Sequence, residues 1–318
     1  PLMDGTLTRF YALAGGRPTA LFFYDGDELN ELLCFGEALN EKASGAVSIF
    51  AVKRGNPAVN PPVLTGRETP FPVFADLKGA VHTAYRLGAN KKTALFVLSP
   101  NLRVLASLLL EDAASTAQKA ISILDASLPH VEPFEIVTQA PVLMIPDVLE
   151  AEICQYLIDV WEKTAHIETG VEQSRGERRF DIISPDIKRR CDHVVTDEML
   201  TRRLTKSIGR RVMPEVEKAF AFRATRFEGY KIACYDAAVG GFFRAHRDNL
   251  SPSTAHRRFA MSLNLNKDYT GGCLRFPEYG PHLYRSDAGG ALVFSGSHVH
   301  EVTAITDGRR FVLLSFLY

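Results

Sequence analysis

The sequence lacks an excess of charge of either sign, because 37 Lys and Arg residues balance 37 Asp and Glu residues. No bulk electrostatic field therefore favours nucleic acid or an acidic membrane surface as a partner. The chain also lacks the run of roughly 18 or more apolar residues that a membrane-spanning helix needs. No low-complexity tract interrupts its 318 residues. These absences predict a globular protein with neither nucleic-acid nor membrane partners.

Cysteine is scarce, and the N-terminal residues show no basic segment followed by an apolar core, as a signal peptide would have. The cysteines are odd in number and form neither a CxxC pair nor a disulfide framework. A reducing cytoplasm is therefore the expected location. The five cysteines are widely separated: Cys34, Cys154, Cys191, Cys234 and Cys273.

A chain of 318 residues is long enough for two domains. Its first part alternates strand and helix patterns, in an order typical of a thioredoxin-like α/β domain over residues 1–126. Residues 126–142 carry three prolines and little periodicity, which marks 127–140 as a linker. The strands are expected at 18–24, 46–52, 93–99 and 103–110, and the helices at 78–87 and 114–126.

The stretch "FPVFADLKGAVHTAYRLGANKKTALFVLSPNLRVLAS" places an aspartate, a helix with a tyrosine and a strand–turn–strand in succession. In this it resembles the distal half of a peroxiredoxin, and the resemblance covers most of residues 8–126. The peroxide-reducing cysteine of that family would fall near Glu31, but the nearest cysteine is Cys34, inside an apolar run and close to Glu31 and Glu37. A reactive thiolate needs a cation or a helix N-terminus. We therefore predict that Cys34 packs in the core and that the domain is a non-catalytic scaffold or docking module.

The second domain is expected over residues 141–318. Asp147 and Glu150 have the spacing of a capping box at the start of a helix. Residues 166–195 are rich in charge and poor in periodicity. From residue 226 onward, short strands separated by Gly-rich turns predict a jelly roll. The predicted fold is therefore a thioredoxin-like α/β domain followed by an α+β domain built on a double-stranded β-helix.

Two histidine motifs lie in this second domain. "GGFFRAHRDN" holds His246 and Asp248, which share one face if the segment is extended, although such a pair alone is more often a solvated polar pair. "FSGSHVHEV" adds His298 and His300. Two histidines and one carboxylate are the facial triad of non-haem iron(II) oxygenases, which leaves coordination positions open. His298 lies close enough to be mistaken for the ligand, but the HEV context favours His300, with His298 at the rim.

The order of motifs is "APVLMIPDVLEAEICQYL", "YKIACYDAAVGGFFRAHRDN", "RRFAMSLNLNKDYTGGCLRFPEYG" and "HEVTAITDGRRF". Over 141–318 the chain resembles the 2-oxoglutarate- and iron-dependent dioxygenases of the prolyl 4-hydroxylase-like group. The resemblance implies His246, Asp248 and His300 as Fe(II) ligands. It implies Arg310 as the anchor for the distal carboxylate of 2-oxoglutarate, and it implies O2 as the oxidant, with ascorbate as a further candidate.

Two further positions bear on the cosubstrate site. Arg309 and Arg310 alternate in direction along a strand, so only one of them faces the barrel interior. Tyr235 matches a family tyrosine that reaches 2-oxoglutarate, and simple packing is an equally open role for it. Phe243 stands where some relatives have a tyrosine.

These patterns favour a hydroxylase that acts on an unactivated C–H bond and releases succinate and CO2. The resemblance implies a peptidyl or free amino-acid side chain as substrate, with proline as the first candidate. A homodimer stays open. Two alternatives remain: a thiol-redox protein with an accessory metal-binding domain, and a catalytically silent metal-binding module. Specificity is expected to reside in the loops 168–195 and 249–257, of which the first is a candidate substrate lid. The arginines of these loops point to an anionic or polar target, and a solvated mobile lid is an equally open role for them: Arg175, Arg178, Arg179, Arg189, Arg190 and Arg257.

Overall fold

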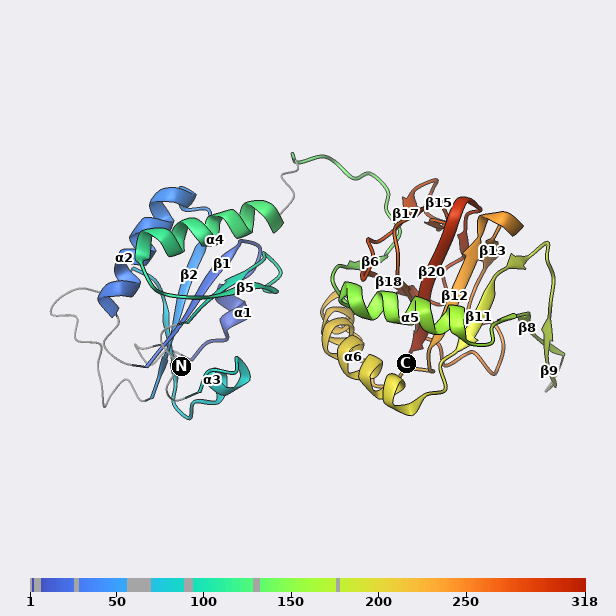
Figure 1. The fold of residues 1–318 in the computed structure, drawn as a ribbon, viewed down its shortest axis with the longest axis horizontal. Coiled ribbons are helices and arrows are strands. Elements are labelled where there is room, and N and C mark those ends of the chain that lie inside the picture. The colour runs from blue at the N-terminus through green and yellow to red at the C-terminus, as the bar shows by residue number, and fades with distance from the viewer. Residues whose placement is uncertain are drawn as a thin grey trace. The chain divides into compact units, whose positions relative to one another are not determined.

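The computed structural model describes residues 2, 7–25, 29–55, 70–88, 94–127, 132–175 and 178–318, with the backbone alone at residue 29 and over 171–182. The chain forms two compact units, Pro1–Phe134 and Glu135–Tyr318 (Figure 1). The limits that the sequence favours, 1–126 and 141–318 with the linker 127–140, stay predictions. Among the described residues, no helix has both the length and the hydrophobicity to cross a membrane.

The first unit contains a five-stranded sheet in the order β3-β2-β1-β4-β5. Strands β1, β2 and β3 run parallel to one another, whereas β4 and β5 are antiparallel to their neighbours. The elements are α1 (Phe10–Leu13), β1 (Thr19–Tyr24), α2 (Leu29–Ala43), β2 (Ser48–Arg54), β3 (Val73–Asp76), α3 (Ala80–Ala84), β4 (Ala94–Leu98), β5 (Val104–Leu109) and α4 (Ala113–Ser127).

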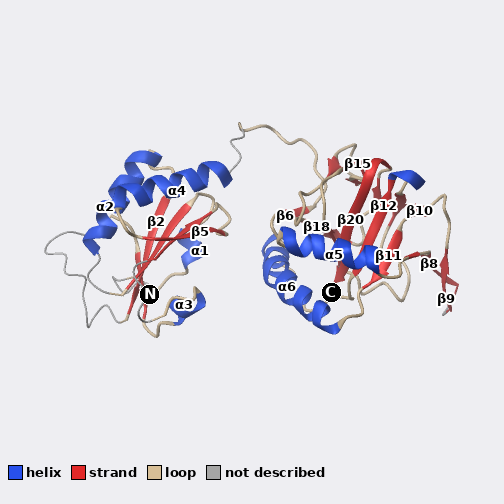
Figure 2. Cartoon of the chain, viewed as in Figure 1, coloured by secondary structure: helices blue, strands red, loops and turns tan. Residues whose placement is uncertain are grey.

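Helices cover both faces of this sheet. Adjacent residues of β1 point to opposite faces, as the pleat of a strand requires. Phe22 packs edge-on against Phe35 of α2, with ring centroids 4.6 Å apart. Phe23 packs against Tyr85, which follows α3, at 4.6 Å. Helices α2 and α4 therefore share one apolar core and α1 and α3 the other (Figure 2). This arrangement confirms the predicted thioredoxin-like class.

The prediction that Cys34 packs in the core is wrong, because its side chain is exposed. The buried stripe of α2 is formed by Leu32, Phe35 and Leu39, which recur at helical spacing. Cys34 lies off that stripe. The residues of the apolar run that suggested burial therefore lie on more than one side of the helix, and the thiol of Cys34 faces solvent.

The second unit is built on two sheets that face each other. The larger follows the order β6-β18-β14-β20-β12-β11-β7, with β15 also paired to β20, and the smaller follows β10-β13-β19-β16-β17. The strands are β6 (Leu143–Ile145), β7 (Ile167–Glu168), β8 (Val171–Arg175), β9 (Arg178–Ile182), β10 (Lys188–Arg189), β11 (Cys191–Val194), β12 (Lys231–Asp236), β13 (Phe242–His246), β14 (Phe259–Asn264), β15 (Tyr269–Gly271), β16 (Leu274–Arg275), β17 (Leu283–Tyr284), β18 (Ala291–Ser295), β19 (His300–Val302) and β20 (Ile305–Leu317).

Two helices, α5 (Ala151–Lys163) and α6 (Glu198–Phe220), cover the outer face of the larger sheet (Figure 1). Along β20, Phe311 and Leu313 point outward into the core shared with these helices. Val312 points the other way, into an interior lined by both sheets. This two-sheet sandwich with antiparallel strands confirms the predicted double-stranded β-helix. It leaves one enclosed interior in which a site can form.

Helix α6 was not expected from the sequence. Its N-terminus is capped by Asp197, whose side chain accepts a hydrogen bond from the backbone N–H of Leu200. The expected capping box before α5 is wrong: Glu150 is the N-cap but makes no side-chain cap, and Asp147 adopts a φ of 52°. The buried stripe of α6 recurs at every fourth residue: Leu200, Leu204, Ile208, Val212 and Val216.

Candidate metal and cosubstrate site

The two motif histidines lie on neighbouring strands of the smaller sheet. His246 ends β13, His300 begins β19, and the two residues are direct cross-strand partners. Their ring centroids are 4.3 Å apart. A register shift separates this pair from the next one, at Phe243. Pairing of these strands therefore brings together two residues that are 54 positions apart in the chain.

Both imidazoles are held in the same way. The Nδ1 atom of His246 lies 2.8 Å from the carbonyl oxygen of Arg244, and Nδ1 of His300 lies 3.0 Å from that of His298. A carbonyl only accepts, so Nδ1 carries a proton in both rings, and the neutral form of each ring has its lone pair on Nε2. Burial lowers the pKa of His300 to about 4, so that it is neutral near pH 7. Neutral imidazoles with free Nε2 atoms are what a metal requires.

Asp248 completes the group. Its two carboxylate oxygens lie 3.5 Å from Nε2 of His246 and 3.4 Å from Nε2 of His300. Burial opposes ionisation of Asp248, but His300 and His246 in their protonated forms, together with Arg257, outweigh it and lower the pKa of Asp248. Its Oδ2 is buried and has no hydrogen-bond partner among the described residues.

One donor atom from each of these three residues lies within 4.8 Å of the others, and no other such group is found in the described part of the chain. When both imidazoles are neutral, a buried carboxylate oxygen that faces their Nε2 lone pairs is unfavourable without a cation. The three residues therefore fit an Fe(II) ion, for which two histidines and one carboxylate are a suitable donor set.

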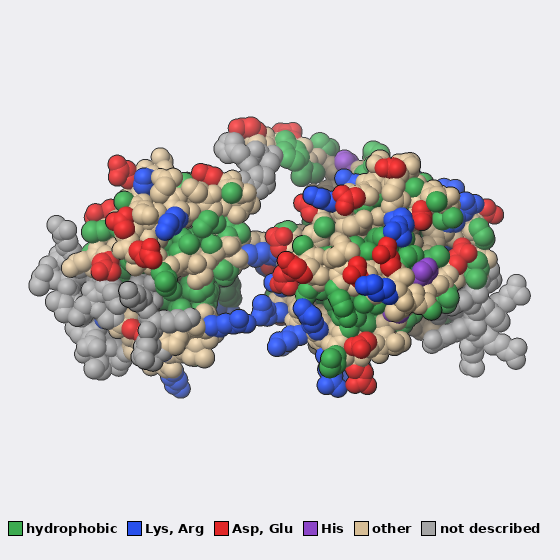
Figure 3. All heavy atoms as spheres, in the orientation of Figure 1, with side chains coloured by type: hydrophobic (Ala, Val, Ile, Leu, Met, Phe, Trp, Pro, Cys, Tyr) green, Lys and Arg blue, Asp and Glu red, His purple; other side chains and the backbone are tan. Residues whose placement is uncertain are grey.

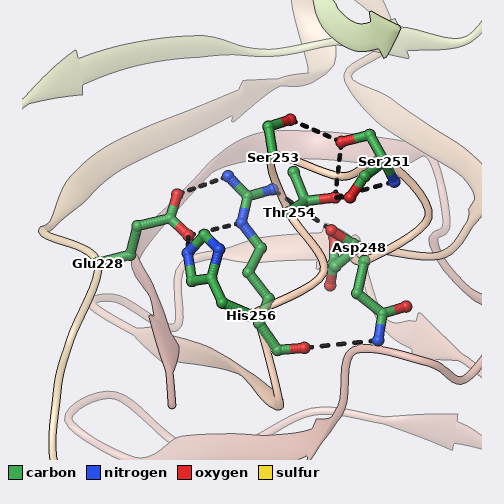
Figure 4. Close-up of polar contacts among 8 residues, drawn as sticks. Glu228, Asp248, Ser251, Ser253, Thr254 and His256 are labelled. Atoms are coloured by element: carbon green, nitrogen blue, oxygen red, sulfur yellow. Dashed lines mark hydrogen bonds and ion pairs between the residues drawn. The ribbon is translucent and has the colours of Figure 1, made fainter. Parts of the chain in front are cut away.

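The loop after Asp248 is fastened to the larger sheet (Figure 4). Arg257 donates to both carboxylate oxygens of Glu228, at 2.7 and 2.5 Å, and also to the backbone carbonyl of Asp248 at 3.4 Å. The backbone N–H of Asp248 donates to the carbonyl of Gly296 at 2.9 Å. Asp248 is thus positioned from both sides through its backbone. Glu228 thus already neutralises the charge of Arg257.

Aromatic rings form the walls around the histidines. Phe243 stacks on His246 with centroids 3.6 Å apart and an interplanar angle of 19°. Phe294 packs edge-on against His300 at 4.6 Å. The position at which some relatives carry a tyrosine is therefore used here to hold a ligand ring in place. His298 lies outside the group: its Nδ1 bonds the hydroxyl of Tyr279 at 3.1 Å.

Arg310 points into the barrel interior and is only 3% exposed. Its Nε lies 3.4 Å from the Asn264 side-chain oxygen, and its Nη2 lies 3.3 Å from the Ser262 hydroxyl. Its Nη1 is buried without a partner among the described residues. Arg309 points outward and pairs with Glu162 at 2.8 Å. A buried guanidinium that meets only neutral side chains is a binding site for an anion.

Tyr235 stands directly opposite Arg310 in the pairing of β12 with β20. The guanidinium of Arg310 lies 5.6 Å from the centroid of the Tyr235 ring. The Tyr235 hydroxyl accepts a hydrogen bond of 3.3 Å from Arg190, which is itself paired with Asp192 at 2.7 Å. Sequence reasoning missed the Arg190–Asp192 pair. The alternation of residues around Tyr235 gave no signal for this pair, because Arg190 lies between β10 and β11 and Asp192 lies in β11, far from Tyr235 in the sequence.

The remaining arginines of the expected specificity loops do not form one patch. Arg189 donates to the backbone carbonyls of Pro185 and Val239. On the face shown in Figure 3, side chains of both charge signs are interspersed over the second unit. The segment 168–195 contains strands β7 to β11 rather than a plain loop. The side chains of Arg175, Arg178 and Arg179 lie outside the described residues, so their expected contacts stay predictions.

Part of the chain matches the model of a known protein family. Residues 230–318 match the model of the 2OG-Fe(II) oxygenase superfamily. The match begins at β12 and ends at the C-terminus, so it includes all three metal-site residues, Tyr235 and Arg310. It confirms the family resemblance of the C-terminal part.

Particular relatives can then be named. Over 61 residues the chain is 36% identical to a PKHD-type hydroxylase of Acaryochloris marina, an alignment that covers 19% of this chain and 27% of that protein. The chain therefore spans only about a quarter of that relative's length.

Two solved structures are also similar. A prolyl-4-hydroxylase of Pseudomonas putida is 19% identical with a TM-score of 0.42, covering 56% of this chain and 92% of that one. For the N-terminal part, peroxiredoxin Q of Xanthomonas campestris is 23% identical with a TM-score of 0.32, covering 39% and 88%.

Proposed function

We propose that the protein is an Fe(II)- and 2-oxoglutarate-dependent dioxygenase that hydroxylates an unactivated C–H bond. One observation carries this proposal. The same barrel interior holds three convergent metal donors, His246, Asp248 and His300, and a buried arginine, Arg310, that has an unpartnered Nη1. A metal site alone fits many activities. A metal site together with an anion site fits a cosubstrate that chelates the metal at one end and carries a carboxylate at the other.

The chain's own residues have distinct tasks in this reaction. When bound, Fe(II) together with 2-oxoglutarate and O2 supplies the oxidising chemistry, with succinate and CO2 as products. His246, Asp248 and His300 would hold the metal, because their donor atoms converge on one another. The aromatic rings of Phe243 and Phe294 restrict the movement of the two imidazoles and exclude water beside them.

Arg310 and Tyr235 orient the cosubstrate in this proposal. A guanidinium is planar and presents its donors in a fixed fork that suits a carboxylate, and Arg310 has its Nη1 still without a partner among the described residues. Tyr235, whose ring centroid lies 5.6 Å from that guanidinium, adds a hydroxyl. Fixing the distal carboxylate at a set depth would place the 2-oxo acid end at the metal group.

The substrate class follows from the relatives and is part of the proposal. Their names include a PKHD-type hydroxylase and a prolyl-4-hydroxylase. We propose a peptidyl or free amino-acid side chain, with proline tested first. The first unit has its one described helix cysteine, Cys34, on a solvent-exposed face without a bonded cation among the described residues. We propose that this unit is not catalytic.

A substrate search tests the function. Purified protein is incubated with Fe(II), 2-oxoglutarate, ascorbate and a proline-containing peptide library, and succinate and peptide masses are followed together. We expect succinate formation that depends on Fe(II) and a gain of one oxygen atom on the responsive peptides. Ascorbate is omitted in a parallel sample, which shows whether it is needed. The matched control is His300→Ala, which removes a metal donor. No succinate under any condition would contradict the proposal.

A further inference from the structure

Tyr235 has a donor that no acceptor satisfies. Its side chain is 2% exposed, and its hydroxyl oxygen receives a hydrogen bond from Nη1 of Arg190 at 3.3 Å. A guanidinium only donates, so the Tyr235 oxygen is the acceptor in this contact and its own proton must point elsewhere. Within the described parts of the chain, no side chain or carbonyl accepts that proton. A buried hydroxyl normally finds a partner.

A second unsatisfied donor lies on the neighbouring strand. Nη1 of Arg310 is buried without a partner among the described residues, and Arg310 is the cross-strand neighbour of Tyr235. Two buried donors on adjacent strands, one of them charged, favour a single anionic acceptor between them. The distal carboxylate of the proposed cosubstrate has that chemistry.

Arg190 is fixed in a way that keeps it from binding the anion itself. Its Nε and Nη2 each lie 2.7 Å from one carboxylate oxygen of Asp192, which is a two-pronged ion pair. Asp192 is 1% exposed and also accepts from the hydroxyl of Thr169 at 2.5 Å. Burial opposes ionisation of Asp192, but Arg190 outweighs it and lowers the pKa of Asp192. Arg190 is thus neutralised and has only Nη1 left to offer.

We infer that the Asp192–Arg190 pair is a positioning device for the cosubstrate, in which Arg190 occupies the Tyr235 oxygen and so turns the Tyr235 proton toward the distal carboxylate of 2-oxoglutarate. This inference rests on the proposed function. Arg190 also lies 5.7 Å from the ring centroid of Phe243, which stacks on the metal-site residue His246. One buried pair therefore contacts side chains beside both ends of the cosubstrate.

The test compares two acids that differ only at the distal end. 2-Oxoglutarate and 2-oxopentanoate both chelate a metal, but 2-oxopentanoate has a methyl group in place of the distal carboxylate. Each is titrated anaerobically into the Fe(II)-loaded protein, and the metal-to-ligand absorption band gives the Kd. In Arg190→Lys we expect the affinity for 2-oxoglutarate to fall about tenfold, because a hydrogen bond to a charged group is weakened. The affinity for 2-oxopentanoate should change by less than about twofold, since its methyl end cannot accept the Tyr235 proton.

A double-mutant cycle shows whether Arg190 acts through Tyr235. Tyr235→Phe should weaken 2-oxoglutarate binding by about tenfold, and adding Arg190→Lys to it should cause no further loss. Arg189→Lys is the matched control, because the adjacent Arg189 bonds only backbone carbonyls. Should Arg190→Lys fail to melt cooperatively, Asp192→Asn replaces it. That change loosens the two-pronged ion pair that holds Arg190. It should lower the affinity for 2-oxoglutarate relative to that for 2-oxopentanoate.

The possible results distinguish failure of the Arg190 positioning role from failure of the proposed dioxygenase function. Equal weakening of both acids by Arg190→Lys, or additive losses in the double variant, would overturn the positioning role and leave the proposed function standing. If the unaltered protein binds 2-oxopentanoate as tightly as 2-oxoglutarate, the distal carboxylate is not recognised. In that case the proposed function itself fails, together with the inference.

Discussion

Replacing Arg310 with alanine should remove most of the affinity for 2-oxoglutarate. Arg310 is 3% exposed, so a carboxylate bound beside it is shielded from water and from salt. The weak value of about 0–1 kcal/mol for surface ion pairs does not apply at this depth. Breaking a buried pair by removing one partner costs about 3–5 kcal/mol. The affinity should therefore fall by about two to three orders of magnitude.

The geometry adds a second expectation. Arg310→Lys keeps the positive charge, but an ammonium cannot contact Asn264, Ser262 and a carboxylate with the fixed fork of a guanidinium. It should recover only part of the lost affinity. Arg309→Ala is the matched control, because Arg309 is the chain neighbour that points outward to Glu162. It should change the Kd by less than about twofold.

The assay is an anaerobic titration of 2-oxoglutarate into the Fe(II)-loaded variants, followed through the metal-to-ligand absorption band. Fe(II) affinity is measured separately, so that loss of the metal is not mistaken for loss of the cosubstrate. If Arg309→Ala and Arg310→Ala weaken 2-oxoglutarate binding equally, the assignment of Arg310 to the inner face of the strand and Arg309 to its outer face is wrong. An unchanged Kd in Arg310→Ala would refute the anchoring role altogether.

Three further outcomes are expected. Gly272→Ala should weaken 2-oxoglutarate binding and lower the melting temperature, because Gly272 has a φ of +62° and an added Cβ would lie 2.9 Å from Cδ of Arg310; unchanged values of both would contradict this. Peroxide consumption by the full chain should not depend on Cys34, so Cys34→Ser should leave any background rate as it is, and a rate that collapses would revive a thiol peroxidase. Burial opposes ionisation of Glu228, but its hydrogen bonds from Arg257 outweigh it and lower its pKa. The contribution of Glu228 to stability is therefore complete above its ordinary pKa and is lost as the pH falls through the lowered value. The difference in unfolding free energy between Glu228→Gln and the unaltered protein should shrink from pH 7 to about pH 3. A difference that stays constant with pH would argue against a stabilising Glu228–Arg257 pair.

The metal group was accessible to sequence reasoning for a physical reason. His246 and Asp248 are close in the chain, and His300 lies in a motif with its own recognisable context. Strand alternation then predicted that Arg310 faces inward and Arg309 outward, because the direction of side chains in a strand depends only on parity. Short motifs and the alternation of side chains along a strand can be predicted from the sequence, since they do not depend on which other strand lies alongside.

The parts that sequence reasoning missed depend on contacts between distant segments. Arg190 and Tyr235 are 45 positions apart, and their contact exists only because β11 pairs with β12. Helix α6 was overlooked because Pro214 and many charged residues obscure a buried stripe. Cys34 was placed in the core because apolar neighbours in the chain were taken as neighbours in space. On a helix the adjacent residues point about 100° apart, and this one faces solvent.

Metal binding tests the central claim most directly. Fe(II) is added anaerobically to the unaltered protein and to His246→Ala, His300→Ala and His298→Ala, and bound iron per chain is determined after equilibrium dialysis, with circular dichroism confirming that each variant is folded. We predict one Fe(II) per chain in the unaltered protein and in His298→Ala, because His298 bonds Tyr279 outside the metal group. We predict loss of binding in His246→Ala and His300→Ala. Full iron occupancy in a folded His300→Ala variant, or loss of iron in His298→Ala alone, would contradict the site described above.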